Sequence, residues 1–487
     1  MNWLLLSELL YLMILIAVCL RIVYDTNSTV KTLAYLLFAI FIPFIGISFY
    51  FSFGINYRKR KLYSKKIIQD NQLWNRIKQD VSTRSEQTYY NTSALIRPDK
   101  HLVRYLTNEM SPLTSGNAVK LLVNGEEKFP AVLAALEEAV NHIHIEYYIY
   151  ENDGIGQQIE EILIRKAKQG IAVRFIYDDF GSRSIRKNIA VRLREAGIQV
   201  FPFYKIVFGR IANRLNYRNH RKIIVIDGRK AFVGGINISD RYINDKDNSL
   251  SKNKVFWRDT HLMMKGLAVH YLQYLFICDW NFCAGEHVEN IKDHFPNIDM
   301  NTSPGDKLIQ IAASGPDSEN PTILYSLLYA IGQAQEEILI TTPYFIPEQS
   351  IMDAIRMAAL SGVSVHLLVP EKSDSRIVEL AASSYYEDLL SAGVNLWFYQ
   401  KGFVHAKTAV IDRKLAIIGT ANMDYRSFDL NFEVNAIIYD GEFAHRLANV
   451  FDDDRKDAVQ IKKEMWSSRP VSRKLLEKSA RLVSPLL

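Results

Sequence analysis

The chain has 487 residues, of which 48% are hydrophobic, 23% charged and 11% aromatic. This composition excludes a disordered chain, a collagen-like repeat and a small disulfide-stabilised protein, and the length predicts two to three domains. The 59 lysines and arginines exceed the 53 aspartates and glutamates only slightly, whereas nucleic-acid-binding proteins carry a stronger excess. The three cysteines form neither a disulfide framework nor a metal-binding motif. No nucleic acid partner is therefore expected.

Residues 1–57 are predicted to form two transmembrane helices. Leu33–Ile55 is an uncharged run that is long enough to cross the hydrocarbon core of about 30 Å. Trp3–Val23 is a weaker span, because Glu8 interrupts it. A signal peptide is the alternative for this first stretch, but the stretch lacks a basic start and a small-residue cleavage site. We expect a membrane-embedded protein with a helical hairpin at its N-terminus.

Basic residues around the two spans predict their orientation. Six lysines and arginines lie in residues 58–66, directly after the second span, whereas the loop between the spans offers only Arg21 and Lys31. The positive-inside rule then places everything after residue 60 in the cytoplasm. We expect a multi-pass protein of the cell membrane with cytoplasmic catalytic domains, in which residues 58–118 form a basic juxtamembrane connector.

From residue 119 onward the pattern alternates strands and helices, and the same order occurs twice. Such alternation predicts helices layered on a sheet, and the matching order in both halves indicates a duplication. We expect an α/β fold with two repeated domains, residues 119–300 and 301–487, whose mixed sheets are flanked by helices. The matching elements are the strands His142–Tyr150 and Ile338–Phe345, the helices Gly156–Gln169 and Gln349–Ser361, and the strands Ile171–Tyr177 and Val363–Val369.

Each repeat ends in the same spacing of polar residues, H-x-K-x4-D followed by a glycine and an asparagine. One copy of such a pattern is a weak signal, because chance produces it in on the order of a few per cent of chains of this length and composition. Two copies at equivalent points of a repeat are a strong signal. The residues are His220, Lys222, Asp227 and Asn237 in the first repeat, and His405, Lys407, Asp412 and Asn422 in the second.

Strand geometry distinguishes the members of this candidate catalytic set. Residues two apart on a strand share a face, so each histidine projects with its lysine. Asp227 and Asp412 have the opposite parity and precede turns, so we interpret them as turn and strand-end anchors in preference to reacting groups. The alternative is that the whole set has no catalytic role, with each histidine buried in the sheet and each lysine exposed to solvent. That interpretation would be preferred for a single motif but not for a matched pair.

Two facing histidine–lysine pairs suit the transfer of a phosphodiester. One histidine, as a neutral imidazole, can attack phosphorus, while the other, as an imidazolium, protonates the departing alkoxide. Lysine ammonium groups and asparagine amides can bind the non-bridging oxygens. Because exchange of one diester for another is nearly balanced in bond energy, no metal, nucleotide or other cofactor is required.

The two H-x-K-x4-D segments resemble the signature of the phospholipase D superfamily, and the chain is similar to the bacterial cardiolipin synthase family over nearly its whole length. Trp257–His261, Gly402–Lys407 and Gly419–Phe428 are among the similar segments. The resemblance implies a membrane phosphatidyltransferase that makes cardiolipin and glycerol from two phosphatidylglycerol molecules. It also implies a phosphohistidine intermediate on His220, with His405 as the acid and base.

The same resemblance implies a carboxylate behind each histidine, on a later strand, and Asp259 and Glu433 match those positions. Phosphatidylglycerol and anionic membrane lipid are the expected partners, and the sequence carries no signal for the oligomeric state. The alternative function is a membrane-anchored phospholipase D-type phosphodiesterase that hydrolyses phospholipid or uses another acceptor alcohol.

Three features outside the motifs have two interpretations each. The basic segment Tyr204–Asn219 is either a rim that gathers anionic headgroups or a solvated loop. The amphipathic C-terminal tail, Arg473–Val483, either docks at the membrane interface or, as is more usual, packs on the catalytic domain. His142 and His144 share a strand face, but no third ligand accompanies them in the sequence, so no metal site is expected.

Overall fold

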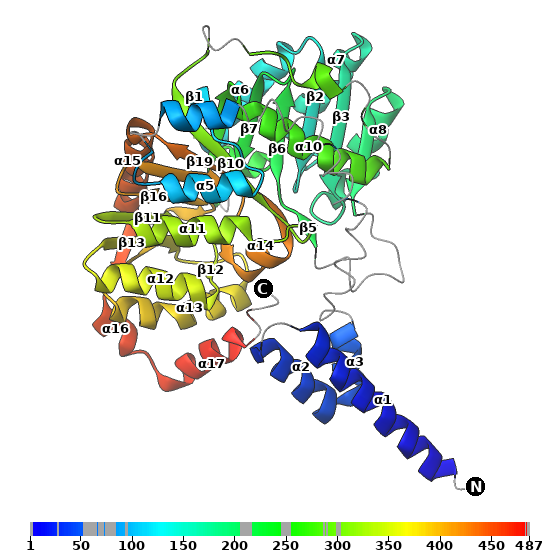
Figure 1. Ribbon diagram of the computed structural model, residues 1–487, viewed down its shortest axis with the longest axis vertical. Helices are drawn as coiled ribbons and strands as arrows, with labels where there is room; N and C mark the ends of the chain where they lie inside the picture. The colour runs from blue at the N-terminus through cyan, green and yellow to red at the C-terminus, as the bar shows by residue number, and fades with distance from the viewer. Residues whose placement is uncertain are drawn as a thin grey trace.

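The computed structural model consists of a helical N-terminal segment and a larger α/β body (Figure 1). It describes residues 3–26, 29–51, 66, 73, 84–92, 96–204, 217–244, 255–285, 288, 291–298, 303–482 and 484.

The described residues of the body form one mixed sheet of 16 strands. The first repeat contributes β1 (Thr114–Val123), β2 (His142–Tyr147), β3 (Ala172–Asp178), β4 (Gln199–Phe203), β5 (Arg218–Asn219), β6 (Lys222–Ile226), β7 (Lys230–Gly234) and β9 (Thr260–Lys265). The second contributes β10 (Lys307–Ser314), β11 (Glu337–Thr341), β13 (Ser364–Pro370), β14 (Asn395–Tyr399), β16 (Thr408–Ile411), β17 (Leu415–Gly419), β19 (Asn431–Tyr439) and β20 (Ala458–Ile461).

The strand order makes the duplication visible. It runs β20-β14-β13-β11-β16-β17-β19-β10-β1-β9-β7-β6-β2-β3-β4, with β5 paired to β19. The antiparallel pair β1–β10 lies at the centre. The strands of the first repeat follow outward from β1, and the equivalent strands of the second repeat follow outward from β10 in the same order. The prediction of two α/β repeats with mixed sheets is confirmed, and the two sheets join into one.

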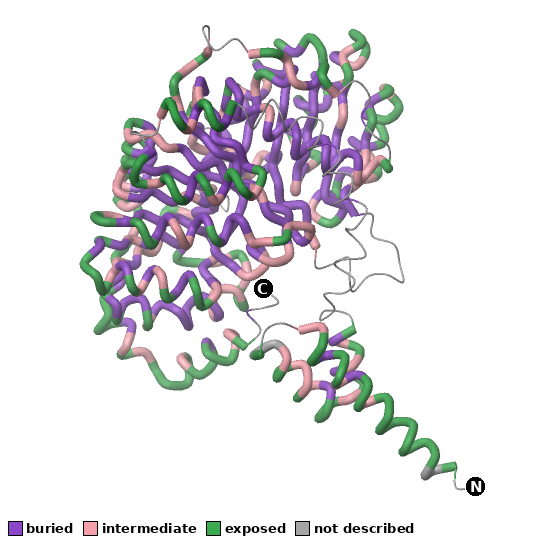
Figure 2. Tube along the Cα trace, viewed as in Figure 1, coloured by how far each residue is buried: buried purple, intermediate pink, exposed green. Residues whose placement is uncertain are grey.

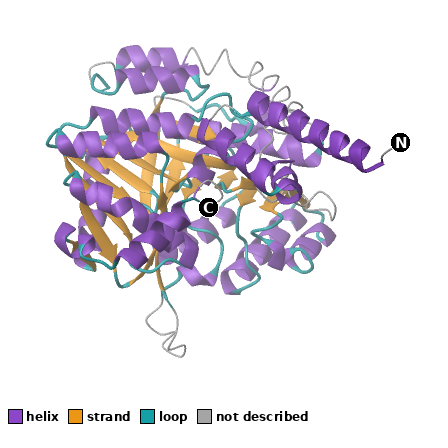
Figure 3. Ribbon diagram, turned by 90° about the horizontal axis from the view of Figure 1, so that it is seen from below, coloured by secondary structure: helices purple, strands orange, loops and turns teal. Residues whose placement is uncertain are grey.

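Helices cover both faces of the sheet (Figure 3). Several begin at an aspartate that caps free backbone amides: Asp153 accepts from the amide of Gly156 and Asp440 from that of Phe443. The covering helices are α6 (Asn124–Glu137), α7 (Gly154–Lys168), α8 (Ile189–Glu195), α10 (Ala268–Ala284), α11 (Thr322–Gln333), α12 (Gln349–Leu360), α13 (Arg376–Ser391) and α15 (Gly441–Lys456).

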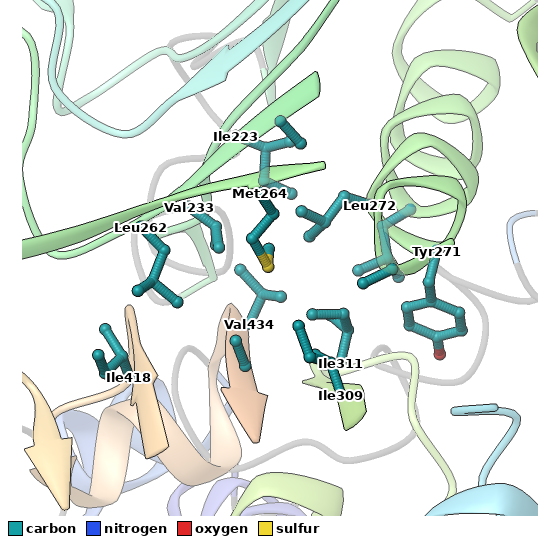
Figure 4. Close-up of a cluster of buried hydrophobic side chains, with 14 of the residues drawn as sticks. Ile223, Val233, Leu262, Met264, Tyr271, Leu272, Ile309, Ile311, Ile418 and Val434 are labelled. Atoms are coloured by element: carbon teal, nitrogen blue, oxygen red, sulfur yellow. The ribbon is translucent and has the colours of Figure 1, made fainter. Parts of the chain in front are cut away.

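A core shared by the two repeats lies where their sheets meet. Val233 and Leu262 of the first repeat belong to the same buried cluster as Ile311, Ile418 and Val434 of the second (Figure 4). The strands are buried along most of their length (Figure 2). Because this apolar core continues across the boundary, the repeats pack as one body.

The expected connector differs from the structure at its C-terminal end. Helix α5 (Lys100–Asn108) packs into the core of the second repeat through Leu102 and Leu106, which are fully buried. The first domain was expected to begin at residue 119, but that residue falls inside β1. The helical spacing of apolar residues in α5 is the physical reason, because it gives the segment a face to bury.

The N-terminal segment contains α1 (Trp3–Asp25), α2 (Thr29–Phe41) and α3 (Pro43–Phe49). Among the described residues, one helix is long and apolar enough to cross a membrane, over Leu6–Asp25. Helix α2 has 13 residues and is about 20 Å long, which is short for a bilayer of about 30 Å. The sequence predicted the first apolar run to be the weaker span, but in the structure it is the first run that forms a helix long enough to cross a membrane.

Pro43 explains why the second apolar run is not one helix. Proline lacks an amide donor and clashes with the preceding turn, and α2 ends two residues before it. The chain then doubles back, because the Tyr50 hydroxyl at the end of α3 lies 3.2 Å from Oδ2 of Asp25 at the end of α1. The remainder of the expected span, residues 52–55, lies outside the described residues, as do the basic residues 58–65.

Lys66, the last of the expected juxtamembrane cations, lies inside the body. Its Nζ is 3.3 Å from Asp279 on α10 and 2.9 Å from Asp317, which follows β10. The side chain is 3% exposed, so this lysine joins the two repeats and does not face a membrane surface. Its charge was counted toward orientation, and paired carboxylates are the reason that it is buried instead.

Candidate active site

Both motif histidines line one cavity of about 360 Å³ between the two repeats. Asn237 and Asn422 line the same cavity. A cavity of this size with a few convergent polar groups is typical of a small-ligand site. The duplication therefore builds one composite site from two half-sites.

His220 lies directly before β6 and is held by a carboxylate of the other repeat. Its Nδ1 is 2.9 Å from both carboxylate oxygens of Glu433 on β19. Glu433 also accepts hydrogen bonds from the Thr420 hydroxyl and, at 3.1 Å, from the Asn431 amide. A carboxylate can only accept, so Nδ1 carries the proton and the lone pair stays on Nε2.

His405 is held in the same way, with the repeats exchanged. Its Nδ1 is 2.7 Å from Oδ2 of Asp259, which follows β8 (Phe256–Arg258) of the first repeat. Oδ1 of Asp259 accepts a 2.7 Å hydrogen bond from the Thr260 amide. The two carboxylates expected from the family resemblance thus lie behind the two histidines, but each serves the histidine of the opposite repeat. Neither repeat holds a complete half-site alone.

The motif lysines are buried beside their histidines. Lys222 Nζ donates to the backbone carbonyl of His220 at 2.7 Å, and Lys407 Nζ lies 2.9 Å from Nδ1 of His405. Burial lowers the pKa of Lys222 to about 7 although Glu433 raises it, and lowers the pKa of Lys407 to about 8 although Asp259 raises it. Both lysines therefore titrate close to neutral pH.

The imidazoles are uncharged at neutral pH. Burial lowers the pKa of His220 to about 4, against the raising effect of Glu433. Burial, followed by the charge of Lys407, lowers the pKa of His405 to about 3. A neutral imidazole with its lone pair on Nε2 is the form that can attack phosphorus or accept a proton.

The two asparagines differ in their contacts. Asn237 Oδ1 accepts from the Ile149 amide at 3.2 Å, and its Nδ2 donates to the Tyr242 hydroxyl at 2.8 Å. Asn422 Oδ1 is buried and has no hydrogen-bond partner within the described part of the chain. Asn237 is thus fixed by the protein, whereas the Asn422 oxygen has no such contact within the described residues.

Asp227 and Asp412 do not line the cavity. Oδ1 of Asp227 accepts from the amides of Asn141 and His142 at 2.8 Å, and Asp412 binds the amides of residues 335–337 in the same way. Both aspartates have positive φ angles, 54° and 50°, which short polar side chains tolerate in turns. These contacts are those of the turn and strand-end anchors that strand parity predicts.

Comparisons with known proteins agree with this geometry. A family model described as cardiolipin synthase, PLD-like domain, matches residues 132–256 and 327–455, one match in each repeat. The chain is 40% identical over 471 residues to the cardiolipin synthase of Alkalihalophilus pseudofirmus, covering 96% of this chain and 91% of that relative. It is 39% identical over 487 residues to the major cardiolipin synthase ClsA of Bacillus subtilis, with 99% of each chain covered. The chain belongs to the cardiolipin synthase family.

Two further matches cover the anchor and the fold. A model described as phospholipase D-nuclease N-terminal matches residues 10–54. The crystal structure of the Haemophilus influenzae phosphatidylserine synthase superposes with a TM-score of 0.57 and 14% identity, covering 81% of this chain and all of that one, so the two share a fold. As a member of the cardiolipin synthase family, this chain is a phosphatidyltransferase of the phospholipase D type.

Several cavity residues of this cardiolipin synthase family member were not predicted. The ring of Tyr148 lies 4.8 Å from that of His220, and the ring of Trp257 lies 5.5 Å from that of His405. Arg241 and Arg426 also line the cavity, each four residues after a motif asparagine. The shared spacing G-x2-N-x3-R in both repeats was the signal that would have found these arginines.

The structure bears on the basic segment and on the C-terminal tail, each of which has two interpretations from the sequence. Of the basic segment Tyr204–Asn219, residues 205–216 lie outside the described residues, whereas Arg218 lines the cavity. Helix α17 (Val471–Arg481) of the tail lies against α13, where Lys474 donates to Glu387 at 3.1 Å. Leu475 and Leu476 of α17 are exposed, so its contact with α13 leaves apolar surface uncovered.

A third histidine joins the pair that the sequence places on β2. His142, His144 and His294 are buried, and one ring nitrogen of each lies within 4.8 Å of the others. Arg174 Nη1 donates to Nε2 of His144 at 3.0 Å, so this lone pair is already used within the protein. None of the three histidines lines the active-site cavity. The sequence could not bring His294 to this position, because it comes from a turn about 150 residues away.

Proposed function

We propose that this chain makes cardiolipin and glycerol from two phosphatidylglycerol molecules in two steps at the composite site. The observation that carries the proposal is the pair of imidazoles in one cavity, each oriented by a carboxylate of the opposite repeat. Two such groups can act on opposite sides of one phosphorus atom, one as nucleophile and one as acid and base.

In the first step, Nε2 of His220 attacks the phosphorus of one phosphatidylglycerol. The phosphorus–oxygen bond to the terminal glycerol breaks, and the alkoxide takes a proton from the His405 imidazolium, so glycerol leaves. Before the lipid binds, His405 is neutral; it takes up this proton as the anionic lipid binds, because the phosphate charge in front and Asp259 behind Nδ1 both raise its pKa. The phosphatidyl group is then bound to His220. Its carboxylate partner, Glu433, stabilises the positive charge that develops on the ring.

In the second step, neutral His405 removes a proton from a glycerol hydroxyl of the second phosphatidylglycerol. The hydroxyl oxygen attacks phosphorus, the bond from phosphorus to Nε2 of His220 breaks, and cardiolipin is released. His220 is neutral again and His405 is again an imidazolium, so the cycle is closed. Lys222 and Lys407 stabilise the equatorial oxygens in both steps, because protonated amines donate without competing negative charge.

We also propose how the enzyme lies on its membrane. Helix α1 crosses the bilayer, and the apolar stretch Thr29–Phe49 enters the bilayer beside the C-terminal end of α1 and returns to that same end. The two repeats then lie on the cytoplasmic side, because the basic residues 58–65 follow the apolar segment. Such an anchor keeps the cavity close to lipid substrates that never leave the bilayer.

The covalent step can be tested with the purified full-length protein in detergent. Phosphatidylglycerol labelled in its phosphate is mixed with enzyme, quenched without acid because phosphohistidine is acid-labile, and digested. Label is expected on a peptide containing His220 and not on one containing His405. Label on His405 alone would exchange the two roles, and no label together with sequential kinetics would favour direct displacement. Identification of cardiolipin by mass spectrometry separates transfer from hydrolysis, which would yield phosphatidic acid.

A further inference from the structure

Helix α17 packs on the body with its charged side. Glu477 is 1% exposed and accepts a 2.6 Å hydrogen bond from Arg469, which precedes the helix. Lys474 donates to a glutamate of α13 at 3.1 Å, and the Arg481 guanidinium lies 4.1 Å from the ring of Tyr385 on α13. Residues three, four and seven apart share one face of a helix, so these charged side chains form the face that meets the body.

The opposite side of α17 is apolar and exposed (Figure 2). Val471, Leu475 and Leu482 are 82%, 66% and 83% exposed, and their spacing of four and seven residues places them in one row, here called the outer row. Leu476 is 55% exposed and borders it. A surface helix ordinarily buries its apolar stripe and exposes its charges. The inverted arrangement of α17 indicates that a partner covers the outer row.

The position of α17 indicates which partner this is. The helix lies at the same end of the molecule as the N-terminal helices, the lower end in Figure 1. From that end α1 extends away from the body, and its stretch Leu6–Asp25 is long and apolar enough to cross a membrane. A bilayer that contains α1 therefore lies beside α17, whose outer row faces away from the body.

The charge of the outer face favours a bilayer over a second copy of the chain. Lys478 is exposed and lies in line with the outer row, seven residues after Val471 and four before Leu482. The single carboxylate of α17, Glu477, is buried on the other side. Two copies that met through this row would bring two lysine charges together without a carboxylate from α17 between them. On a bilayer, the stem of Lys478 can lie along the apolar region while its ammonium group reaches the lipid phosphates.

We propose that the outer row of α17 lies in the interface of the bilayer that α1 crosses, as a second contact between the chain and its membrane. This inference rests on the proposed membrane placement of α1 and goes beyond the proposed reaction. The first turn of α13 lines the active-site cavity through Val378, and α17 packs along the same helix. Contact at the outer row therefore holds the cavity beside the bilayer that supplies the lipid substrates.

Photo-cross-linking to lipid tests this contact without requiring turnover. Full-length enzyme is reconstituted into vesicles of phosphatidylcholine and phosphatidylglycerol that contain a little phosphatidylcholine with a diazirine in its acyl chain. After irradiation and digestion, mass spectrometry identifies the lipid-linked peptides. Peptides from α17 are expected together with peptides from α1, the positive control. None is expected from α8, which exposes Val191 on the first repeat.

Variants of the outer row give the measurement its control. Leu475→Glu is expected to lower the ratio of α17 to α1 cross-links by about tenfold, because a charge replaces an apolar side chain in the interface. Leu475→Met keeps the row apolar, so its ratio is expected to stay near that of the unmodified enzyme. Val191→Glu is the matched control, because it makes the same kind of change on an exposed helix of the first repeat. The ratio is internal to each sample and does not depend on the amount of protein.

Lipid cross-links on α1 without any on α17 in the unmodified enzyme would overturn the inference. An equal loss of the ratio in Val191→Glu would also overturn it, because the effect would then not belong to α17. Cross-links between Lys478 of two chains in place of lipid cross-links would show that a second copy covers the outer row. If α1 itself takes up no lipid label, the proposed membrane placement fails, and the inference fails with it. An enzyme that hydrolyses phosphatidylglycerol instead of making cardiolipin would contradict the proposed reaction and leave the expected cross-links unchanged.

Discussion

The two motif histidines are held by carboxylates in different ways. Glu433 is reached by the Thr420 hydroxyl and by the Asn431 amide, so its charge is shared among three side chains. At the position equivalent to Thr420 the first repeat has Gly235, where any Cβ would collide with Oδ1 of Asp259. The shorter carboxylate therefore needs the glycine, and the longer one uses the threonine.

This difference leads to a prediction for Glu433 and Thr420. Glu433→Gln is expected to lower kcat by about a hundredfold or more, because His220 loses the negative charge of its partner and an amide donor can replace one of the two acceptor oxygens that fix its tautomer. Thr420→Val is expected to have a milder effect, about tenfold, since it removes one of several donors to that carboxylate. Initial rates of cardiolipin formation measure both, and Thr420→Ser is the control that keeps the hydroxyl. Equal rates in Thr420→Val and in the unmodified enzyme would show that this hydroxyl does not support catalysis.

The lysines give the pH dependence its direction. A lysine carries a charge below its pKa and loses it above, and the pKa values of Lys222 and Lys407 are about 7 and about 8. With a short-chain phosphatidylglycerol, whose diester charge is constant, kcat/KM is therefore expected to fall as the pH rises through this range. Lys222→Arg keeps its charge throughout, so it is expected to have lower activity but a shallower alkaline fall. A profile that is flat up to about pH 10, the ordinary range of a lysine, would contradict this.

At the scale of elements, the motif aspartates connect strands and do not face the substrate. Asp227→Ala would leave the amides of Val140, Asn141 and His142 without their acceptor. We expect a loss of at least about 2 kcal/mol in the free energy of unfolding, because these amides are next to the buried start of β2. The midpoint of urea unfolding in detergent measures it. The folded fraction is expected to keep a kcat within about threefold of the unmodified enzyme. A normally stable but inactive Asp227→Ala protein would instead place this aspartate in the chemistry.

The sequence predicts the local geometry of this site well, because strand periodicity is local. The spacing of two residues predicted that each lysine lies beside its histidine, and each does, but the lysines are not among the residues that line the cavity. It could not predict that Glu433 serves His220, because that contact depends on how two copies of one fold face each other. The second apolar run is not one continuous helix for a different reason. Hydropathy counts the apolar residues around Pro43, but it does not register that a proline interrupts the helix there.

At the scale of the whole molecule, the two repeats cannot separate without dismantling both half-sites. Short parallel pairings cross the boundary on each side of the cavity, β5 with β19 and β8 with β15 (Gly402–Val404). Arg258 of the first repeat donates to Asp454 of the second at 2.7 Å, and both side chains are buried. The sheet itself is continuous through β1 and β10. Within the described residues, the cavity that holds both motif histidines is therefore formed by the two repeats of one chain.

This arrangement predicts the outcome of mixing two inactive variants. Chains carrying His220→Ala and chains carrying His405→Ala are each expected to be inactive, because either change removes one of the two reacting imidazoles from the only cavity that holds both motifs in the described structure. Co-expression of the two is expected to produce no cardiolipin, because restoring a cavity would require the repeats of two chains to exchange across the β1–β10 pair and the crossing strands.

Lipid mass spectrometry of cells without cardiolipin synthases of their own measures the product, and immunoblots of membranes control for the amount of each variant. Co-expression of either variant with the unmodified chain is the positive control. Cardiolipin in the mixed-variant cells would mean that the composite site forms between chains, with the sheet continuing from one molecule into the next.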